Sequence, residues 1–98
     1  MARVRILRAA VLEASSASDW YAERDAMSAE QFRIALDETV ASIVALPGIG
    51  QLLQDESSVR RARLRRFPWW VIYEEGDGVI TILAVMHEKR RPGYWREP

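Results

Sequence analysis

The sequence predicts a single α+β domain with the element order β-α-α-β-β-β. Three observations predict this class: a short alternating segment at residues 3–8, two segments with helical spacing between residues 9 and 46, and strand-like runs after residue 57. Helices grouped ahead of a run of strands are typical of α+β proteins. A length of 98 residues suits one hydrophobic core, so we expect one domain over residues 1–98.

The first elements are a strand and a helix. Val4 and Ile6 alternate with arginines, which predicts a half-buried strand. A helix is expected over residues 9–24, which contain no Gly or Pro. Its small and aromatic residues recur at helical spacing, at Ala10, Ala14, Ala17 and Tyr21.

A second helix follows. Ser28 and Gln31 fit a capping box at its start, and Pro47 with Gly48 predicts its end. Its expected apolar face consists of Phe32, Leu36, Val40, Ile43 and Leu46. Because the link at residues 25–27 is short, the two helices should form an antiparallel hairpin.

Three strands are predicted in the second half of the chain. Ala62 and Leu64 alternate with arginines, which places these arginines on one solvated face of the first strand. Residues 69–73 are rich in aromatic and β-branched side chains, and glycines within residues 74–78 should supply the positive φ of a hairpin turn. The apolar run at residues 79–86 should be the central strand, covered on both faces.

Composition excludes several kinds of site. The chain has no cysteine and one histidine, which excludes disulfide scaffolds, zinc fingers, thiol nucleophiles and multi-histidine metal sites. We therefore expect neither a metal nor a cofactor. No apolar run approaches the roughly 20 residues that cross a bilayer, and arginines interrupt the apolar residues near the N-terminus. We expect a cytoplasmic protein without a membrane segment.

Charge is distributed unevenly, although the net charge is zero. Residues 1–58 hold five arginines and nine acidic residues, hence −4, whereas residues 59–98 hold nine basic and five acidic residues, hence +4. Such polarity can create a basic surface for a phosphate or carboxylate partner. The alternative is that the two halves neutralise each other in the fold.

The densest basic segment is residues 60–66, with arginine at five of its seven positions. Like charges on one strand face repel one another, so folding alone gives no reason to concentrate them. We expect this segment to bind a polyanion or an acidic protein segment, and the alternative is an exposed face whose arginines prevent edge pairing. The candidate binding residues are Arg60, Arg61, Arg63, Arg65 and Arg66.

The tail from residue 87 combines a histidine, basic residues and aromatic residues. Histidine titrates near neutral pH, so this combination could bind phosphate, stack a base and transfer a proton. The candidates are His87, Lys89, Arg90, Arg91 and Tyr94. The alternatives are that His87 is a hydrogen-bonded structural residue and that Trp95 pins the tail over the core. The Trp69-Trp70 pair is interpreted as core and helix-packing material, and the alternative is a stacking platform.

A pattern of spaced residues runs through nearly the whole chain: Ala10, Glu13 and Trp20-Tyr21; Phe32, Leu36, Ile43 and Pro47; Val59-Arg60, Leu64, Phe67-Pro68 and Ile72-Tyr73; and residues 82–85, His87, Arg90, Pro92 and Tyr94-Trp95. In this order the pattern resembles the RelE/ParE superfamily, the toxins of bacterial toxin–antitoxin (plasmid stabilization) modules. The resemblance implies an antiparallel helical hairpin packed on a small, twisted, mainly antiparallel sheet. It also implies growth inhibition and a cognate antitoxin that wraps and neutralises the toxin in a hetero-oligomer.

The superfamily divides by target. RelE-like members cut messenger RNA on the ribosome without a metal, and ParE-like members poison DNA gyrase. By match to RelE-like positions, Arg61 and Arg63 would hold the phosphate, Lys89, Arg90 or Arg91 would stabilise charge, and His87 or Tyr94 would act as acid or base. RelE-like nucleases place an arginine where this chain has Trp70, which favours a gyrase-directed inhibitor over a metal-independent endoribonuclease. A non-toxic nucleic-acid-binding adaptor is the third alternative.

Overall fold

The computed structural model describes residues 3–53, 58–90 and 93–96. Its elements follow the predicted order, with one additional short strand. They are β1 (Arg3–Ile6), α1 (Arg8–Ala22), α2 (Ala26–Ala45), the 3₁₀ turn η1 (Pro47–Ile49), β2 (Gln51–Leu52), β3 (Val59–Arg63), β4 (Trp69–Gly76), β5 (Val79–His87) and the 3₁₀ turn η2 (Tyr94–Arg96). The α+β class is confirmed. Within these described ranges, no helix is long and apolar enough to span a bilayer.

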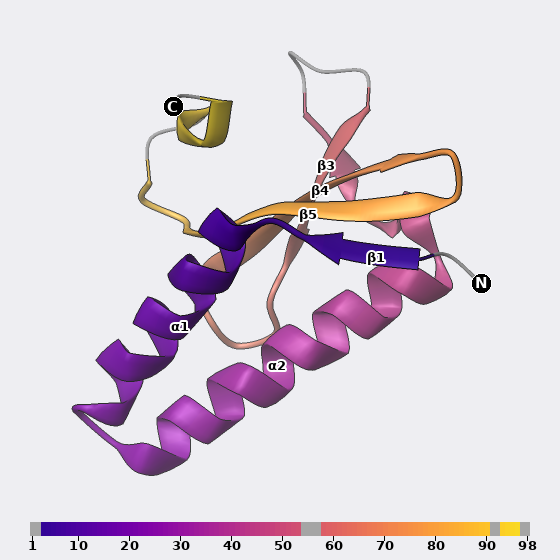
Figure 1. Ribbon diagram of the computed structural model, residues 1–98. Helices are drawn as coiled ribbons and strands as arrows, with labels where there is room; N and C mark the ends of the chain where they lie inside the picture. The colour runs from indigo at the N-terminus through magenta and orange to yellow at the C-terminus, as the bar shows by residue number, and fades with distance from the viewer. Residues whose placement is uncertain (1–2, 54–57, 91–92, 97–98) are drawn as a thin grey trace.

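The five strands form one mixed sheet in the order β1-β5-β4-β3-β2. β1 runs parallel to β5 and the other three pairs are antiparallel, so the sheet is mainly antiparallel. The middle strand is β4, and the apolar run that was expected there forms β5 beside it. Figure 1 shows α1 and α2 as an antiparallel hairpin on one side of the sheet, with η2 beyond the other side.

The sheet separates two hydrophobic clusters. The cluster on the helix side contains Phe32 and Tyr73, both fully buried, and Trp69 packs against it. The cluster on the opposite side contains Ile72, and Trp70 packs against it. Neighbouring residues of β4 thus face opposite sides, as strand geometry requires. Side chains of the C-terminal segment, Tyr94 and Trp95, cover the second cluster, which confirms that Trp95 pins the tail.

A β-bulge changes which side of the sheet the side chains at the end of β5 face. The pairing with β4 skips Leu83, so one extra residue lies in β5. Ile82 faces the helices before the bulge and Val85 does so after it. The bulge therefore places His87 on the helix side, directly opposite its partner Trp69.

The start and the apolar face of α2 differ from the prediction. The cap is Asp25, whose carboxylate accepts the Met27 N–H at 3.2 Å and the Ser28 hydroxyl at 2.9 Å. The predicted box of Ser28 and Gln31 is wrong because the cap lies three residues earlier, at Asp25, and the helix begins at Ala26. Leu46 lies beyond the helix end and is 61% exposed.

Two expectations about the sheet are confirmed only in part. The strand at residues 3–6 is present as β1, but all four of its residues are exposed, including Val4 (39%) and Ile6 (50%), so neither face of this edge strand lies in the core. The hairpin turn between β4 and β5 is confirmed, and Gly78 supplies a positive φ of 75° as expected. The second positive φ is at Asp77 (54°) rather than at Gly76, because Gly76 belongs to β4. An Asp-Gly pair is a preferred sequence for this tight type of hairpin turn.

Candidate functional site

The five arginines of residues 60–66 lie in three different places. β3 ends at Arg63, and successive side chains along a strand point to opposite faces. Arg60 lies on the helix side of the sheet, whereas Arg61 and Arg63 lie on the opposite side. Arg65 and Arg66 lie in the loop after β3, next to α2. The expected arginine face is therefore confirmed for Arg61 and Arg63, whereas Arg65 lies beyond the end of β3.

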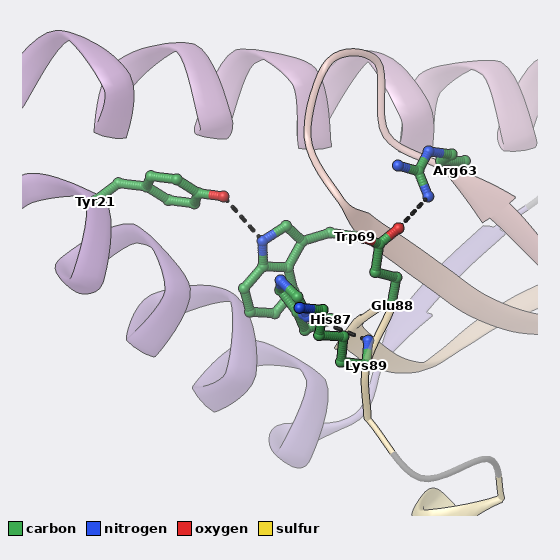
Figure 2. A network of polar contacts seen from close by, with 6 residues as sticks. All are labelled: Tyr21, Arg63, Trp69, His87, Glu88 and Lys89. Atoms are coloured by element: carbon green, nitrogen blue, oxygen red, sulfur yellow. Dashed lines mark hydrogen bonds and ion pairs between the residues drawn. The ribbon is translucent and has the colours of Figure 1, made fainter.

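Arg61 and Arg63 stack on Trp70. Their Cζ atoms lie 4.2 Å and 5.5 Å from the centroid of the Trp70 ring. The Arg61 Nε donates to the Gln51 Oε1 at 3.1 Å, and the Arg63 Nη1 pairs with the Glu88 Oε2 at 3.1 Å (Figure 2). The Arg63 side chain remains 46% exposed. We call these three residues, Arg61, Arg63 and Trp70, the arginine shelf.

The other three arginines are placed differently. Arg60 donates from Nη1 to the carbonyl oxygens of Gly50 at 2.7 Å and Gly48 at 3.3 Å, which ties β3 to the connection after α2. Arg65 and Arg66 are exposed, and no side-chain hydrogen bond or ion pair joins them to the rest of the described chain. Arg66 has a φ of 71°, in the left-handed region. Arg60 thus supports the fold, whereas the loop pair is free to contact a partner.

His87 lies on the helix side of the sheet. Its ring packs edge to face on Trp69, with the ring centroids 5.2 Å apart, and its Nδ1 accepts the Lys89 N–H at 3.2 Å (Figure 2). The Trp69 Nε1 in turn donates to the Tyr21 hydroxyl at 3.1 Å. The Lys89 side chain is exposed, and Arg91 lies outside the described residues. The sheet thus separates His87 from the arginine shelf.

Glu13 of α1, which sequence reasoning did not select as a site residue, holds the C-terminal segment. Its Oε1 accepts the Val85 N–H at 3.1 Å and its Oε2 accepts the Tyr94 hydroxyl. Burial, followed by the hydrogen bond and the charge of Glu13, raises the pKa of Tyr94 well above its ordinary value of 10.0. The available signal was the position of a carboxylate between Ala10 and Ala17, on the buried stripe of the helix.

One groove of about 730 Å³ runs between α1 and the end of the sheet. His87, Arg90 and Tyr94 line it, together with the apolar side chains of Leu12, Trp20, Trp69 and Met86. The Arg90 Cζ lies 4.2 Å from the centroid of the Tyr94 ring. Arg61 and Arg63 are not part of this lining. Among the described residues, no group of three or more His, Cys, Asp or Glu side chains is arranged to hold a metal ion.

Comparison with known proteins identifies the family. The profile of the family described as ParE toxin of type II toxin-antitoxin system, parDE, matches residues 4–92. The chain belongs to the ParE toxin family. It is therefore the toxin component of a type II toxin–antitoxin system, and its partner is an antitoxin.

The fold of this ParE-family toxin recurs in a solved structure titled "Chromosomal ParDE TA system from P. aeruginosa". The two chains superpose with a TM-score of 0.76 at 22% sequence identity, over 89% of this chain and 96% of the other. No curated protein matches the chain significantly. The resemblance to the RelE/ParE superfamily is confirmed, and the match lies on its ParE side.

Proposed function

We propose that this ParE-family toxin acts in the cytoplasm as an inhibitor of DNA gyrase rather than as a ribonuclease. The observation that carries the proposal is the separation of two groups of residues by the sheet. Metal-free RNA cleavage needs cations on the phosphate within reach of an acid and a base. Here the cations of the arginine shelf stack on Trp70, while His87 lies on the opposite, helix side of the sheet.

The state of Tyr94 adds support. A general base must accept a proton near the working pH, whereas burial and Glu13 raise the pKa of Tyr94 and keep its hydroxyl protonated. The hydroxyl is also occupied as a donor to Glu13. We therefore assign Tyr94 to holding the C-terminal segment in place rather than to proton transfer.

In this proposal the exposed cations contact the protein target. The residues involved are Arg61 and Arg63 of the shelf and Lys89 of the tail. The antitoxin would neutralise the toxin by forming a hetero-oligomer in which these surfaces are covered.

The second candidate function is ribosome-dependent RNA cleavage. It is favoured by one observation, that His87, Arg90 and Tyr94 line the same groove. In that case Arg90 would stabilise charge, and His87 would act as acid or base without a metal.

An expression experiment tests the proposal. The chain is induced alone, or together with its antitoxin, in bacteria that carry a reporter message and a plasmid. We expect growth arrest that the antitoxin relieves, with gyrase-linked DNA breaks and an intact message by primer extension. Discrete cuts within translated codons, abolished by His87→Ala, would instead establish the nuclease. Normal growth of cells that contain the folded chain would leave only a non-toxic adaptor.

A further inference from the structure

The arginine shelf has a geometry suited to a defined class of partner. We infer that it binds an acidic protein segment through two carboxylates that lie two residues apart on an extended chain. The inference rests on the proposed function, because the segment would belong to the protein target. The shelf recognises that segment, and the neighbouring loop arginines do not.

The first argument is preorganisation. A guanidinium that stacks on an aromatic ring keeps the N–H donors in its own plane, where they can form paired hydrogen bonds to a carboxylate. Arg61 and Arg63 each use one side-chain hydrogen bond within the described residues, to Gln51 and to Glu88. Stacking on Trp70 holds the remaining donors in a fixed position. Binding therefore costs less side-chain conformational entropy than it would at an arginine that does not stack.

The second argument is spacing. Arg61 and Arg63 lie two residues apart on one face of β3, and Arg63 is paired directly with Trp70. Alternate residues of a strand lie about 6.6 Å apart, which is also the separation of alternate side chains on an extended partner. Two acidic residues with one residue between them would therefore place one carboxylate at each guanidinium.

The third argument separates a protein partner from a single-stranded nucleic acid. Nucleic-acid sites of that kind offer an open aromatic face on which a base stacks. The Trp70 ring carries guanidinium groups, and it also packs against the cluster that contains Met86, its neighbour on β5. These features favour carboxylates.

Glu88 acts as a displaceable carboxylate in this arrangement. Its side chain is 40% exposed and pairs with Arg63 at 3.1 Å. Exposed ion pairs of this kind add little stability, so an incoming carboxylate displaces Glu88 at small cost. Removing its charge should therefore strengthen the binding of an acidic segment.

The test measures binding of the full chain to fluorescein-labelled poly-L-glutamate and to a labelled oligothymidylate by fluorescence anisotropy. We expect the double variant Arg61→Gln/Arg63→Gln to bind poly-L-glutamate about tenfold more weakly. The matched control Arg65→Gln/Arg66→Gln removes the same charge and should change binding less than about twofold. Glu88→Gln should bind more tightly. Trp70→Leu keeps every charge and should weaken binding because the shelf is lost, with circular dichroism verifying its fold.

Two results would overturn the inference. Equal losses in the two double variants would show a response to net charge alone, and tighter binding of oligothymidylate that depends on the shelf would assign the surface to nucleic acid. A gyrase supercoiling assay in the presence of the same proteins separates the two proposals. If the wild-type chain leaves gyrase active, the proposed function fails while glutamate binding still decides the shelf. If the wild-type chain and Arg61→Gln/Arg63→Gln inhibit gyrase equally, the shelf fails and the function stands.

Discussion

At the scale of single residues, Tyr73 fastens the connection between α2 and the sheet. Its buried hydroxyl donates to the Pro47 carbonyl at 2.6 Å and accepts the Gly50 N–H at 2.9 Å. Burial raises the pKa of Tyr73, with smaller opposing effects from the Gly50 hydrogen bond and the charge of Arg60. One hydroxyl thus satisfies two backbone groups in the turn that precedes β2.

This contact makes Gly50 intolerant of a side chain. A Cβ at Gly50 would lie 2.5 Å from the Tyr73 hydroxyl and 2.9 Å from the Arg61 carbonyl oxygen, whereas a Cβ at Gly48 would meet nothing within 4 Å. We expect Gly50→Ala to lower the free energy of unfolding by about 1–3 kcal/mol, as overpacking does. Gly48→Ala is the matched control and should stay within about 0.5 kcal/mol of wild type in urea titrations. Equal effects of the two substitutions would contradict the assigned contact.

The two tyrosines with raised pKa values make the free energy of unfolding depend on pH in the alkaline range. Because folding raises the pKa of Tyr73 and Tyr94 above 10.0, the folded state holds these protons more tightly than the unfolded chain does. The associated stability is fully present below about pH 10 and is lost as the pH rises above it.

Urea titrations at about pH 9 and about pH 11 measure this loss. We expect the free energy of unfolding to fall between the two pH values, and Tyr94→Phe to show a smaller fall than wild type. Tyr94→Phe should also cost about 1 kcal/mol at neutral pH, because it leaves a Glu13 oxygen without its donor. An identical alkaline fall in the variant would mean that Tyr94 titrates normally in the folded chain.

Individual site residues were predictable only in part. The Arg61 and Arg63 positions followed from strand alternation, but their stacking on Trp70 depends on the register between β3 and β4. The role of Glu13 depends on the length of β1. Because β1 ends at Ile6 and α1 begins at Arg8, the Val85 N–H is left to a side-chain acceptor, Glu13. Neither register nor strand length is encoded in local spacing.

At the scale of elements, the start of α2 tests which residue caps it. Because Asp25 accepts the Met27 N–H, Asp25→Ala should destabilise the fold by about 1 kcal/mol. Gln31→Ala, at the exposed position that the predicted capping box required, should change stability by less than about 0.5 kcal/mol. Thermal unfolding of both variants measures the difference. A larger loss from Gln31→Ala would restore the box and remove Asp25 as the cap.

The bulge in β5 shows why the faces of the last strand were not predictable. Residues 79–86 are apolar almost throughout, so their sequence carries no alternation that would reveal the extra residue at Leu83. By contrast, the order of helices and strands followed from changes of period along the chain, which depend on neighbouring residues alone. Short β2 was missed because two residues are too few to show a period.

At the scale of the whole molecule, the sheet acts as a partition. The helical hairpin and His87 lie on one side, and the arginine shelf lies on the other. The groove runs past the end of the sheet, so its lining also includes Met86 and Tyr94 of the second cluster. The charge split along the sequence predicted a basic surface but not its division, because pleating distributes consecutive arginines over two faces. The proposal of gyrase inhibition depends on this partition.

A reaction with purified components tests that proposal most directly. Gyrase, relaxed plasmid, ATP and the purified chain are combined, and supercoiled and cleaved DNA are separated on gels. We predict that the chain stops supercoiling and leaves DNA breaks bound to gyrase, and that addition of the antitoxin restores supercoiling. Full gyrase activity at every concentration of a chain that arrests growth in cells would contradict the account.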